Sequence, residues 1–246
     1  MCCNKEGTMA QKKVNAVIHS QEKLAEGIYS MWLDAPEMAE VAVPGQFIAV
    51  YTNDPSKLLP RPISICEADK ENGRLRIVYR IAGAGTKEFS ECKAGDTLDI
   101  MGPLGNGFPL KKKKAFLIGG GIGIPPMLEL AKNLDCEKTA VIGYRDKETF
   151  LADELRKYAD VVIATEDGSV GTKGNVIDAI RAEKLTADII YACGPTPMLK
   201  ALKTYAMENG IECYISLEEK MACGIGACLG CVCHSKDIDE HSNVRN

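Results

Sequence analysis

The sequence has few histidines, no basic patch with interleaved aromatic residues and no long apolar run, and each of these shortages excludes a class of function. Its three His, at positions 19, 234 and 241, form no recognisable dyad, so we expect no histidine-based acid–base site. The net charge of −4 and the lack of a basic patch with interleaved aromatic residues argue against nucleic-acid binding. No apolar stretch is long enough to span a bilayer, so any membrane role would act through a partner.

Cysteine, by contrast, is abundant, with 11 residues in a chain of 246. The start of the sequence, where Met9 is an alternative first residue, carries no apolar signal segment. We therefore expect a cytoplasmic protein, whose thiols stay free or bind metal in a reducing compartment. The length suggests two domains and a small appendage, and 46% apolar with 26% charged residues is typical of a globular protein.

The first part of the chain is broken into short runs rich in β-branched and apolar residues. They include residues 14–18, 46–51 and 75–79. Turn signals such as Pro44-Gly45 and Asn72-Gly73 separate the runs at the spacing typical of all-β folds. This pattern predicts a small antiparallel β-barrel over residues 12–110.

After the lysine run at 111–114, which we interpret as a solvated linker, the pattern changes to strand, glycine turn and helix, and it repeats. Continuous apolar strands at 115–118, 139–142, 160–164 and 188–192 alternate with helical stretches. Apolar strands of this kind are typical of a parallel sheet covered on both faces. The sequence thus predicts a multidomain β plus α/β protein, with a parallel-sheet domain over 111–212 and a small module at 213–246.

The small module contains Cys223-Gly-Ile-Gly-Ala-Cys228-Leu-Gly-Cys231, a C-x4-C-x2-C run that matches the plant-type [2Fe–2S] ligand spacing. Its glycines let the backbone curl tightly, so that amides can point at thiolate sulfurs. A disulfide, a zinc site or cysteines that only pack are the alternatives. The reducing compartment disfavours the disulfide, and the crowding of three ligands into nine residues disfavours zinc.

A plant-type cluster needs a fourth thiolate, and the only later cysteine is Cys233, two residues after Cys231. Three interpretations remain: the chain is truncated, Cys233 substitutes, or the cluster is incomplete. We expect truncation, because the sequence stops in a polar stretch without a closing strand or an apolar anchor. Cys233 would have to bend a C-x-C segment around the iron.

A glycine-rich turn, Gly121-x-Gly123-x-x-Pro126, follows the first apolar strand of the predicted sheet. Ligands of open parallel sheets lie beyond the carboxyl ends of the strands, and two glycines there allow a dinucleotide pyrophosphate to approach. Pro125 and Pro126 start a helix whose free amides favour an anion. The turn therefore predicts a dinucleotide site, with a merely tight turn as the alternative.

Four further turns could contact a cofactor, although each by itself could equally be an ordinary turn. Cys193-Gly194-Pro195 ends the last parallel strand near where a nicotinamide would lie, and Asp167 and Ser169 could bond a ribose. In the barrel, Arg61-Pro62-Ile63-Ser64 offers a guanidinium and a hydroxyl suited to a phosphate pair. Gly83-Ala84-Gly85-Thr86 offers amides and a hydroxyl for the other side of the phosphate pair that Arg61 would contact.

In this order, the segments RPIS, GAGT, GGGIGIPPML and CGPTPML resemble the ferredoxin reductase superfamily, whose barrel binds flavin and whose second domain binds NAD(P). The added run MACGIGACLGC and the GNGF after Gly102-Pro103 narrow the resemblance to the electron-transfer subunits of NAD-linked, class 1B dihydroorotate dehydrogenases. The resemblance extends from about Val14 to Cys233.

The resemblance implies a set of contacts for each cofactor. FAD would contact Arg61, Pro62, Ile63, Ser64, Gly85 and Thr86. The nicotinamide nucleotide would contact Gly119, Gly120, Gly121, Gly123, Asp167, Ser169, Cys193, Gly194 and Pro195. The [2Fe–2S] cluster would be held by Cys223, Cys228 and Cys231, and in the family a fourth cysteine follows the polar stretch that here occupies 234–246.

The resemblance also implies a route for electrons and a partner. Electrons would pass from an FMN-containing dihydroorotate dehydrogenase catalytic subunit through [2Fe–2S] and FAD to NAD⁺, within a heterotetramer that serves pyrimidine biosynthesis. The sequence itself does not separate NAD from NADP, because Arg145 suits a 2′-phosphate and Asp146 suits a 2′-hydroxyl. The alternatives are a related subunit of a hydrogenase or transhydrogenase-like complex, and a non-catalytic module that binds zinc or flavin.

Overall fold

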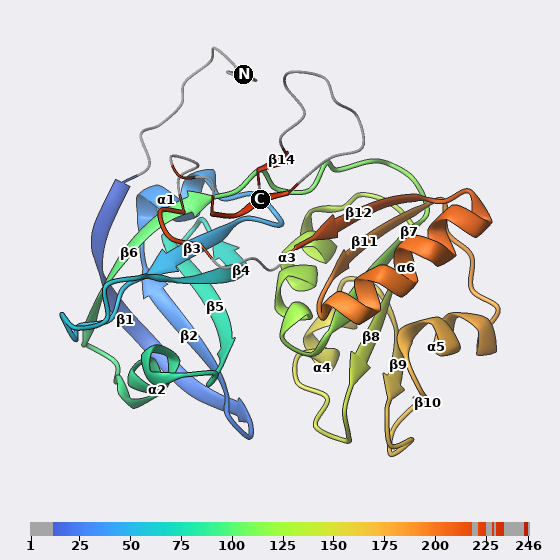
Figure 1. Cartoon of the computed structure of the whole chain (residues 1–246), viewed down its shortest axis with the longest axis horizontal. Helices are drawn as coiled ribbons and strands as arrows, with labels where there is room; N and C mark the ends of the chain where they lie inside the picture. The colour runs from blue at the N-terminus through green and yellow to red at the C-terminus, as the bar shows by residue number, and fades with distance from the viewer. Residues whose placement is uncertain (1–11, 218–220, 225–227, 229, 234–243, 246) are drawn as a thin grey trace, which may run out of the picture.

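The computed structural model describes residues 12–217, 221–224, 228, 230–233 and 244–245, which form two domains side by side. The barrel occupies one side of Figure 1 and the parallel sheet with its helices occupies the other. In this part of the chain, no helix has the length and apolar character needed to cross a membrane. The predicted β plus α/β organisation is confirmed.

The barrel is closed and antiparallel, with strand order β1-β2-β5-β4-β3-β6. Its strands are β1 (Lys12–Ala25), β2 (Ile28–Asp34), β3 (Phe47–Val50), β4 (Arg61–Asp69), β5 (Arg74–Arg80) and β6 (Thr97–Leu104). Along β6, every second residue from Leu98 to Leu104 is buried, which is the period of a strand with one face on a core. The sequence pattern did not predict two short helices, α1 (Pro36–Val41) between β2 and β3 and α2 (Ala84–Glu91) between β5 and β6.

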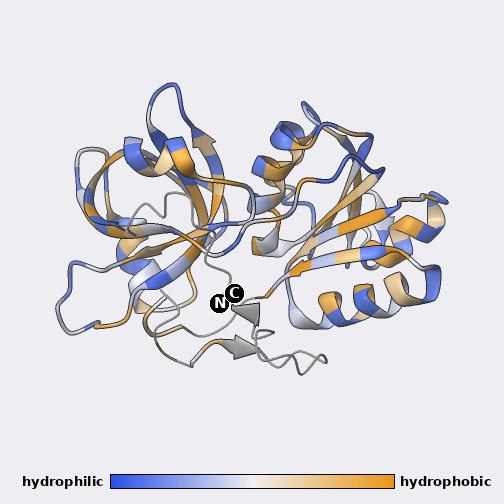
Figure 2. Cartoon of the chain, turned by 90° about the horizontal axis from the view of Figure 1, so that it is seen from above, coloured by the Kyte–Doolittle hydropathy of each residue, from blue (hydrophilic) through white to orange (hydrophobic). Residues whose placement is uncertain are grey.

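The second domain is a parallel sheet of order β10-β9-β8-β7-β11-β12. The strands are β7 (Ala115–Gly120), β8 (Lys138–Tyr144), β9 (Asp160–Thr165), β10 (Thr172–Lys173), β11 (Ile189–Cys193) and β12 (Glu212–Ser216). The helices are α3 (Pro125–Asn133), α4 (Ala152–Leu155), α5 (Val176–Ala182) and α6 (Thr196–Asn209). The strands between the helix layers are apolar and the outer helix faces carry the polar residues, as Figure 2 shows.

The two faces of the sheet have separate apolar cores because alternate residues of a strand point in opposite directions. On β7, Ala115 and Leu117 pack with α3 and α4, whereas Phe116 and Ile118 pack with α5 and α6. The first of these cores also contains Cys66 and Val78 of the barrel. The α3 face of the sheet is therefore the face that joins the two domains, with α3 lying between them in Figure 1.

The sheet extends past the boundary that the sequence pattern placed at residue 212. Strand β12 begins at Glu212 and pairs with β11 up to Ser216, because α6 returns the chain to the sheet edge. The lysine run forms the connection between the domains, and its members make ion pairs that include Lys113 with Glu212 at 3.0 Å. In the terminal module, β13 (Val232–Cys233) pairs with β14 (Val244–Arg245).

Candidate functional site

A cavity of about 630 Å³ lies between the barrel and the sheet. Five of the six residues predicted to contact FAD line it, namely Arg61, Pro62, Ile63, Ser64 and Thr86. They come from the start of β4 and the start of α2, which the barrel brings to one wall. The opposite wall comes from Ile122 of the nucleotide turn and from the end of β12.

Gly85, the sixth of these residues, is buried beneath Arg61. A Cβ at position 85 would overlap the guanidinium of Arg61, so glycine lets this side chain lie flat across the first turn of α2. The guanidinium also donates to the carbonyl oxygen of Leu59. The arginine is thus held beside the free amides of a helix N-terminus, an arrangement that suits a phosphate pair.

The segment Gly83-Ala84-Gly85-Thr86 forms the entry to α2. The Thr86 hydroxyl accepts from the amides of Ala82, at 2.8 Å, and Gly83, at 3.2 Å, and donates to the carbonyl of Gly83. These two amides are therefore occupied within the turn, whereas the sequence pattern suggested that the segment exposes its amides to a ligand. The amides of the first helical turn have no partner within the helix and remain the donors that an anion could take up.

The predicted nucleotide residues of β7 and β11 meet at the point where the strand order reverses. From β7 the chain proceeds to β8, β9 and β10 on one side and then returns to β11 on the other. Gly121, with φ of 53°, and Gly123 form a single 3-10 turn after β7, and Gly123 packs against the carbonyl of Cys193 at the end of β11. This reversal is where open α/β sheets bind their ligands.

Small residues make the meeting point of β7 and β11 compact. A Cβ at Gly120 would lie 2.7 Å from the Sδ of Met198, and one at Gly194, where φ is 151°, would lie 3.1 Å from the backbone of Gly120. Cys193 is 2% exposed, and Pro195 precedes α6. The structure therefore brings Gly119–Gly123 together with Cys193–Pro195 at one edge of the sheet, next to the cavity through Ile122.

Asp167 and Ser169 lie after β9, at the same carboxyl edge but two strands away from β7. The Asp167 carboxylate accepts from the amide of Ser169 at 2.9 Å, which holds the turn. The Ser169 hydroxyl and then this amide keep the pKa of Asp167 below its usual value. The pair forms the side-chain turn that was one of the two interpretations of this segment, and it does not line the cavity.

The cysteine loop lies close to the same cavity. Met221 and Leu217, which lead into the loop, line the cavity, and a Cβ at Gly224 would lie 3.4 Å from Leu104 of β6. The amide of Cys228 donates to the Sγ of Cys223 at 3.3 Å, the kind of contact that a thiolate at an iron–sulfur site receives. Cys231 is 7% exposed.

The donor set of this loop suits an iron–sulfur cluster, because three thiols and an amide aimed at one sulfur stand in a glycine-rich backbone. Among the residues that the structure describes, however, no three His, Cys, Asp or Glu side chains converge on one point. The backbone of Cys233 lies in β13. Its side chain falls outside the described part of the chain.

Several cavity residues carried no signal of their own in the sequence. Phe108 and Tyr214 are far apart in the sequence, yet both line the cavity and both contact Tyr191, with ring centroids 5.5 Å and 5.7 Å away. The Tyr191 hydroxyl donates to the carbonyl of Pro109 at 2.7 Å. Tyr214 escaped prediction because the expected domain boundary separated it from the sheet, whereas Phe108 belongs to the GNGF segment that carried part of the resemblance.

Comparison with protein families adds two matches along the chain. Residues 15–108 match the oxidoreductase FAD-binding domain, and residues 218–245 match the iron–sulfur cluster binding domain of dihydroorotate dehydrogenase B. The chain is 44% identical over 234 residues to the electron transfer subunit of dihydroorotate dehydrogenase B (NAD⁺) from Geobacillus sp., a match that covers 92% of this chain and 90% of the relative. The subunit of the same name from Streptococcus mutans is 45% identical over 242 residues, covering 95% and 93%.

Solved structures agree with these matches. An NADH-dependent reduced ferredoxin–NADP oxidoreductase, described in connection with flavin-based electron bifurcation, superposes with a TM-score of 0.82 at 32% identity, covering 91% of this chain and 83% of the other. Phthalate dioxygenase reductase, described as a modular structure for electron transfer from pyridine nucleotides to [2Fe–2S], gives a TM-score of 0.63 at 26% identity, covering 82% and 68%.

Proposed function

Because the chain belongs to the electron transfer subunits of NAD⁺-linked dihydroorotate dehydrogenase B, with an FAD-binding and an iron–sulfur domain, we propose that it transfers electrons between an FMN-containing catalytic subunit and NAD⁺. The route would run through a [2Fe–2S] cluster and FAD and would serve pyrimidine synthesis. The observation that carries the proposal is that one cavity is bordered by the predicted flavin residues, by the nucleotide turn at Ile122 and by the approach to the cysteine loop at Met221.

Each wall of the cavity has a separate task in this proposal. Arg61 and the first turn of α2 would bind the FAD pyrophosphate, and Pro62, Ile63 and Ser64 would contact the flavin. When bound, a flavin exchanges hydride with nicotinamide and single electrons with an iron–sulfur cluster. The residues of this chain then need only to bind, orient and shield the groups, which agrees with a cavity that has no His among its lining residues.

The nucleotide would lie at the junction of β7 and β11, because only small residues there let its phosphates and ring approach the backbone. Gly119, Gly120, Gly121 and Gly123 would contact the phosphates, and Cys193, Gly194 and Pro195 would border the nicotinamide. Asp167 and Ser169 would face the ribose from the next loop along the edge. The Asp167 carboxylate, whose pKa is lowered, is negatively charged at neutral pH and would repel a 2′-phosphate.

The carboxylate of Asp167 offers a direct test of the choice of nucleotide. Asp167→Asn keeps an oxygen for the Ser169 amide but removes the charge. We expect the rate of flavin reduction by NADPH to rise relative to that by NADH, measured by anaerobic stopped-flow absorbance. Ser169→Ala, which leaves the charge in place, is the matched control. A preference of the unaltered protein for NADPH would contradict the assignment to NAD.

The cluster would be held by Cys223, Cys228 and Cys231. A fourth ligand would come from Cys233 or from a cysteine that follows the present sequence. Cys233→Ser separates these sources when the iron content of the complete subunit is measured. Retention of iron in this variant assigns the fourth ligand elsewhere, and its loss assigns it to Cys233.

The decisive experiment for the proposal is to purify the subunit from its native cell and identify what accompanies it. We expect flavin absorbance, iron and sulfide, and a co-purifying dihydroorotate dehydrogenase catalytic chain that carries FMN. We expect NADH to bleach the flavin absorbance under anaerobic conditions. Zinc in place of iron, together with no flavin spectrum, would refute the proposal in favour of a non-catalytic binding module.

A further inference from the structure

A buried carboxylate joins the two domains. Glu129 lies on α3 and is 4% exposed, and its Oε2 accepts from the backbone amide of Ala68, on β4 of the barrel, at 3.0 Å. Its Oε1 accepts from the side-chain amide of Asn133 at 3.0 Å. Burial raises the pKa of Glu129, while these hydrogen bonds and the nearby Lys132 oppose that rise. An acidic side chain is thus kept in the domain interface by one bond that reaches across it, to Ala68, and by a second within its own helix, to Asn133.

The amide of Ala68 needs this acceptor because of how β4 is built. Strand β3 pairs with β4 from Arg61 to Ser64, and the amide of Ile65 donates to the carbonyl of Gln46 at 3.0 Å, the residue before β3. In the described part of the chain, no strand pairs with this edge beyond Ile65. A register shift between Ile65 and Glu67 on the other edge turns Cys66 out of the barrel towards α3. The Ala68 amide therefore meets α3 instead of a strand, and the Glu129 carboxylate satisfies a donor that would otherwise be buried without a partner.

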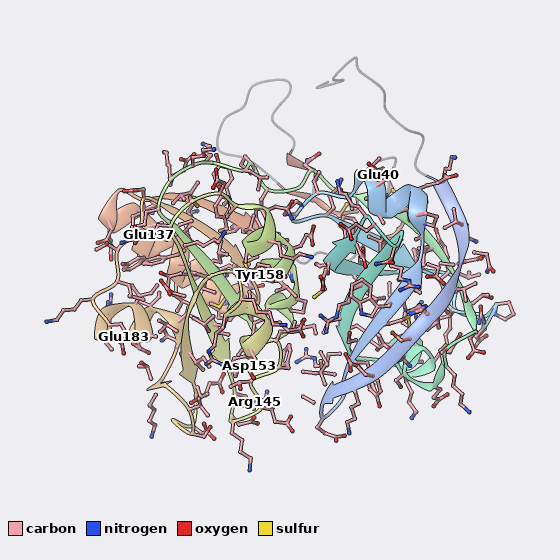
Figure 3. The ribbon with its side chains drawn as sticks, turned by 180° about the vertical axis from the view of Figure 1, so that it is seen from behind. Glu40, Glu137, Arg145, Asp153, Tyr158 and Glu183 are labelled. Carbon is pink, nitrogen blue, oxygen red and sulfur yellow. The ribbon has the colours of Figure 1, made fainter. Side chains whose placement is uncertain are left out.

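Ion pairs surround this hydrogen bond. Lys132 of α3 pairs with Glu67 of β4 at 2.7 Å. The guanidinium of Arg76, on β5 and 5% exposed, contacts Glu154 of α4 at 3.1 Å and donates to the Ser30 hydroxyl at 2.9 Å. Figure 3 shows Asp153 and Tyr158, which flank Glu154 in sequence, on the side of the sheet domain nearer the barrel, with Glu183 on the far side.

The two elements that Glu129 joins carry the two cofactor sites at their other ends. Strand β4 begins with Arg61–Ser64, which line the flavin cavity, and α3 begins directly after the glycine turn that contains Ile122. Both elements are short, so a shift of α3 against β4 moves the nucleotide turn against the cavity. Hydride transfer requires donor and acceptor atoms about 3–3.5 Å apart, and a misplacement of about 1 Å can cost about 100-fold in rate.

We propose that Glu129 is a positioning residue for hydride transfer: its bond to the Ala68 amide sets where α3 sits along β4, and so how closely the nucleotide turn approaches the flavin. The inference rests on the proposed function. Apolar contacts alone would permit sliding between the domains, whereas the Glu129 carboxylate is held by Asn133 of its own helix and bonds Ala68 in one position. The surrounding ion pairs of Lys132 and Arg76 then limit rotation about that point.

The test compares three variants in the complete subunit, bound to its catalytic partner. Glu129→Leu keeps the approximate size of the side chain but cannot accept from Ala68, Glu129→Gln keeps an acceptor, and Glu208→Leu changes an exposed glutamate on α6 as a control. Each is assayed for FAD content, for flavin reduction by dithionite, and for flavin reduction at saturating NADH in anaerobic stopped flow. The long-wavelength absorbance of the complex of reduced flavin with NAD⁺ reports ring stacking directly.

We expect Glu129→Leu to retain FAD and its dithionite reaction but to be reduced by NADH about 10- to 100-fold more slowly, with a weakened long-wavelength band. Glu129→Gln should restore the rate to within a few fold, and Glu208→Leu should match the unaltered protein. A Glu129→Leu protein that contains FAD and reacts with NADH at the unaltered rate would overturn the inference.

A second variant covers the case in which Glu129→Leu does not bind FAD. Lys132→Met removes the half-buried ion pair to Glu67 and leaves the Ala68 bond intact, and it should slow reduction by NADH while dithionite reduction is unchanged. Equal NADH rates in this variant and the unaltered protein would overturn the inference as well. If the unaltered protein itself is not reduced by NADH, the proposed function fails first, and that result is obtained before any variant is compared.

Discussion

The carbonyl oxygen of Cys193 packs directly against the Cα of Gly123, so that the end of β11 closes over the turn that follows β7. A side chain at position 123 would overlap this carbonyl and the amide of Gly194, both of which are backbone groups that cannot swing away. The contact ties the two strands at which the sheet reverses its order, and it fixes the start of α3.

Replacement of Gly123 should therefore harm both folding and nucleotide binding. We expect Gly123→Ala to lower the free energy of unfolding by about 1–3 kcal/mol, the usual cost of overpacking a close contact, and to slow flavin reduction by NADH. Urea denaturation measures the first effect. Gly83→Ala is the control, since its backbone is extended and a Cβ there meets nothing within 4 Å. Equal stabilities of the two variants would contradict the expectation.

Gly85 should matter through Arg61 and not through the fold. A Cβ at position 85 displaces the flexible guanidinium instead of a backbone group, so Gly85→Ala should weaken FAD retention while the barrel stays folded. Equilibrium dialysis of FAD in the two single variants and the double variant Gly85→Ala with Arg61→Ala separates the causes. If the effect passes through Arg61, the second substitution adds little to the first. Additive losses would show that Gly85 contacts FAD by itself.

Iron retention should depend on the thiols of the cysteine loop and not on those of the barrel and sheet domains. Cys223→Ser, Cys228→Ser and Cys231→Ser should each lower iron per subunit and bleach the visible absorbance of the cluster, because an alcohol is a poor ligand for iron compared with a thiolate. Cys92→Ser and Cys136→Ser replace half-buried cysteines of the other two domains and should leave iron unchanged. Loss of iron in either control would mean that the loop is not the cluster site.

Acid should break the ion pairs that Glu212 makes with Lys111 and Lys113 of the connection between the domains. The pKa of Glu212 is lowered from 4.5 to about 2, first by Lys111 and then by the Tyr214 hydroxyl and Lys113. A lowered pKa means that these bonds stabilise the fold above about pH 4.5 and are lost as the pH falls towards 2. The Tm of Glu212→Gln should thus lie below that of the unaltered protein at pH 7, and the difference should shrink below pH 4.5.

The control for this titration is Asp135→Asn, which breaks the highly exposed pair with Lys112 and should hardly change Tm at any pH. A Tm difference for Glu212→Gln that stays constant from pH 7 to pH 3 would show that the Glu212 bonds do not stabilise the fold.

The order of elements could be predicted from the sequence because local patterns determine it. Short runs rich in β-branched and apolar residues, separated by turn signals, predicted the barrel, and continuous apolar strands such as residues 115–118 predicted the parallel sheet. The end of this domain was missed, because β12 (Glu212–Ser216) is half-buried at a sheet edge and lacks the continuous apolar run of the inner strands. The helix α2 was missed since GAGT contains two glycines, which local propensity assigns to a turn.

The candidate site was predictable to the extent that glycine and proline mark it. The turns at Gly121, Gly123 and Gly194 carry their own signal, and the structure gathers them at one edge of the sheet. Tyr214 and Glu129 could not be identified, because an aromatic residue on a strand and a glutamate on a helix have many uses. What distinguishes them is a long-range contact, with Tyr191 and Ala68 respectively, that only the fold creates.

The two halves of β4 contact different parts of the molecule: Arg61–Ser64 line the cavity, and Cys66–Ala68 face α3. A chimera that joins the barrel of one such reductase to the sheet of another at the lysine connection would therefore keep its cofactor residues. It would still lose the matched contact that sets the position of α3 along β4. A chimera that takes β4 and α3 from the same protein would keep the position of one domain against the other. In this architecture a strand of one domain and a helix of the other therefore have to be exchanged together.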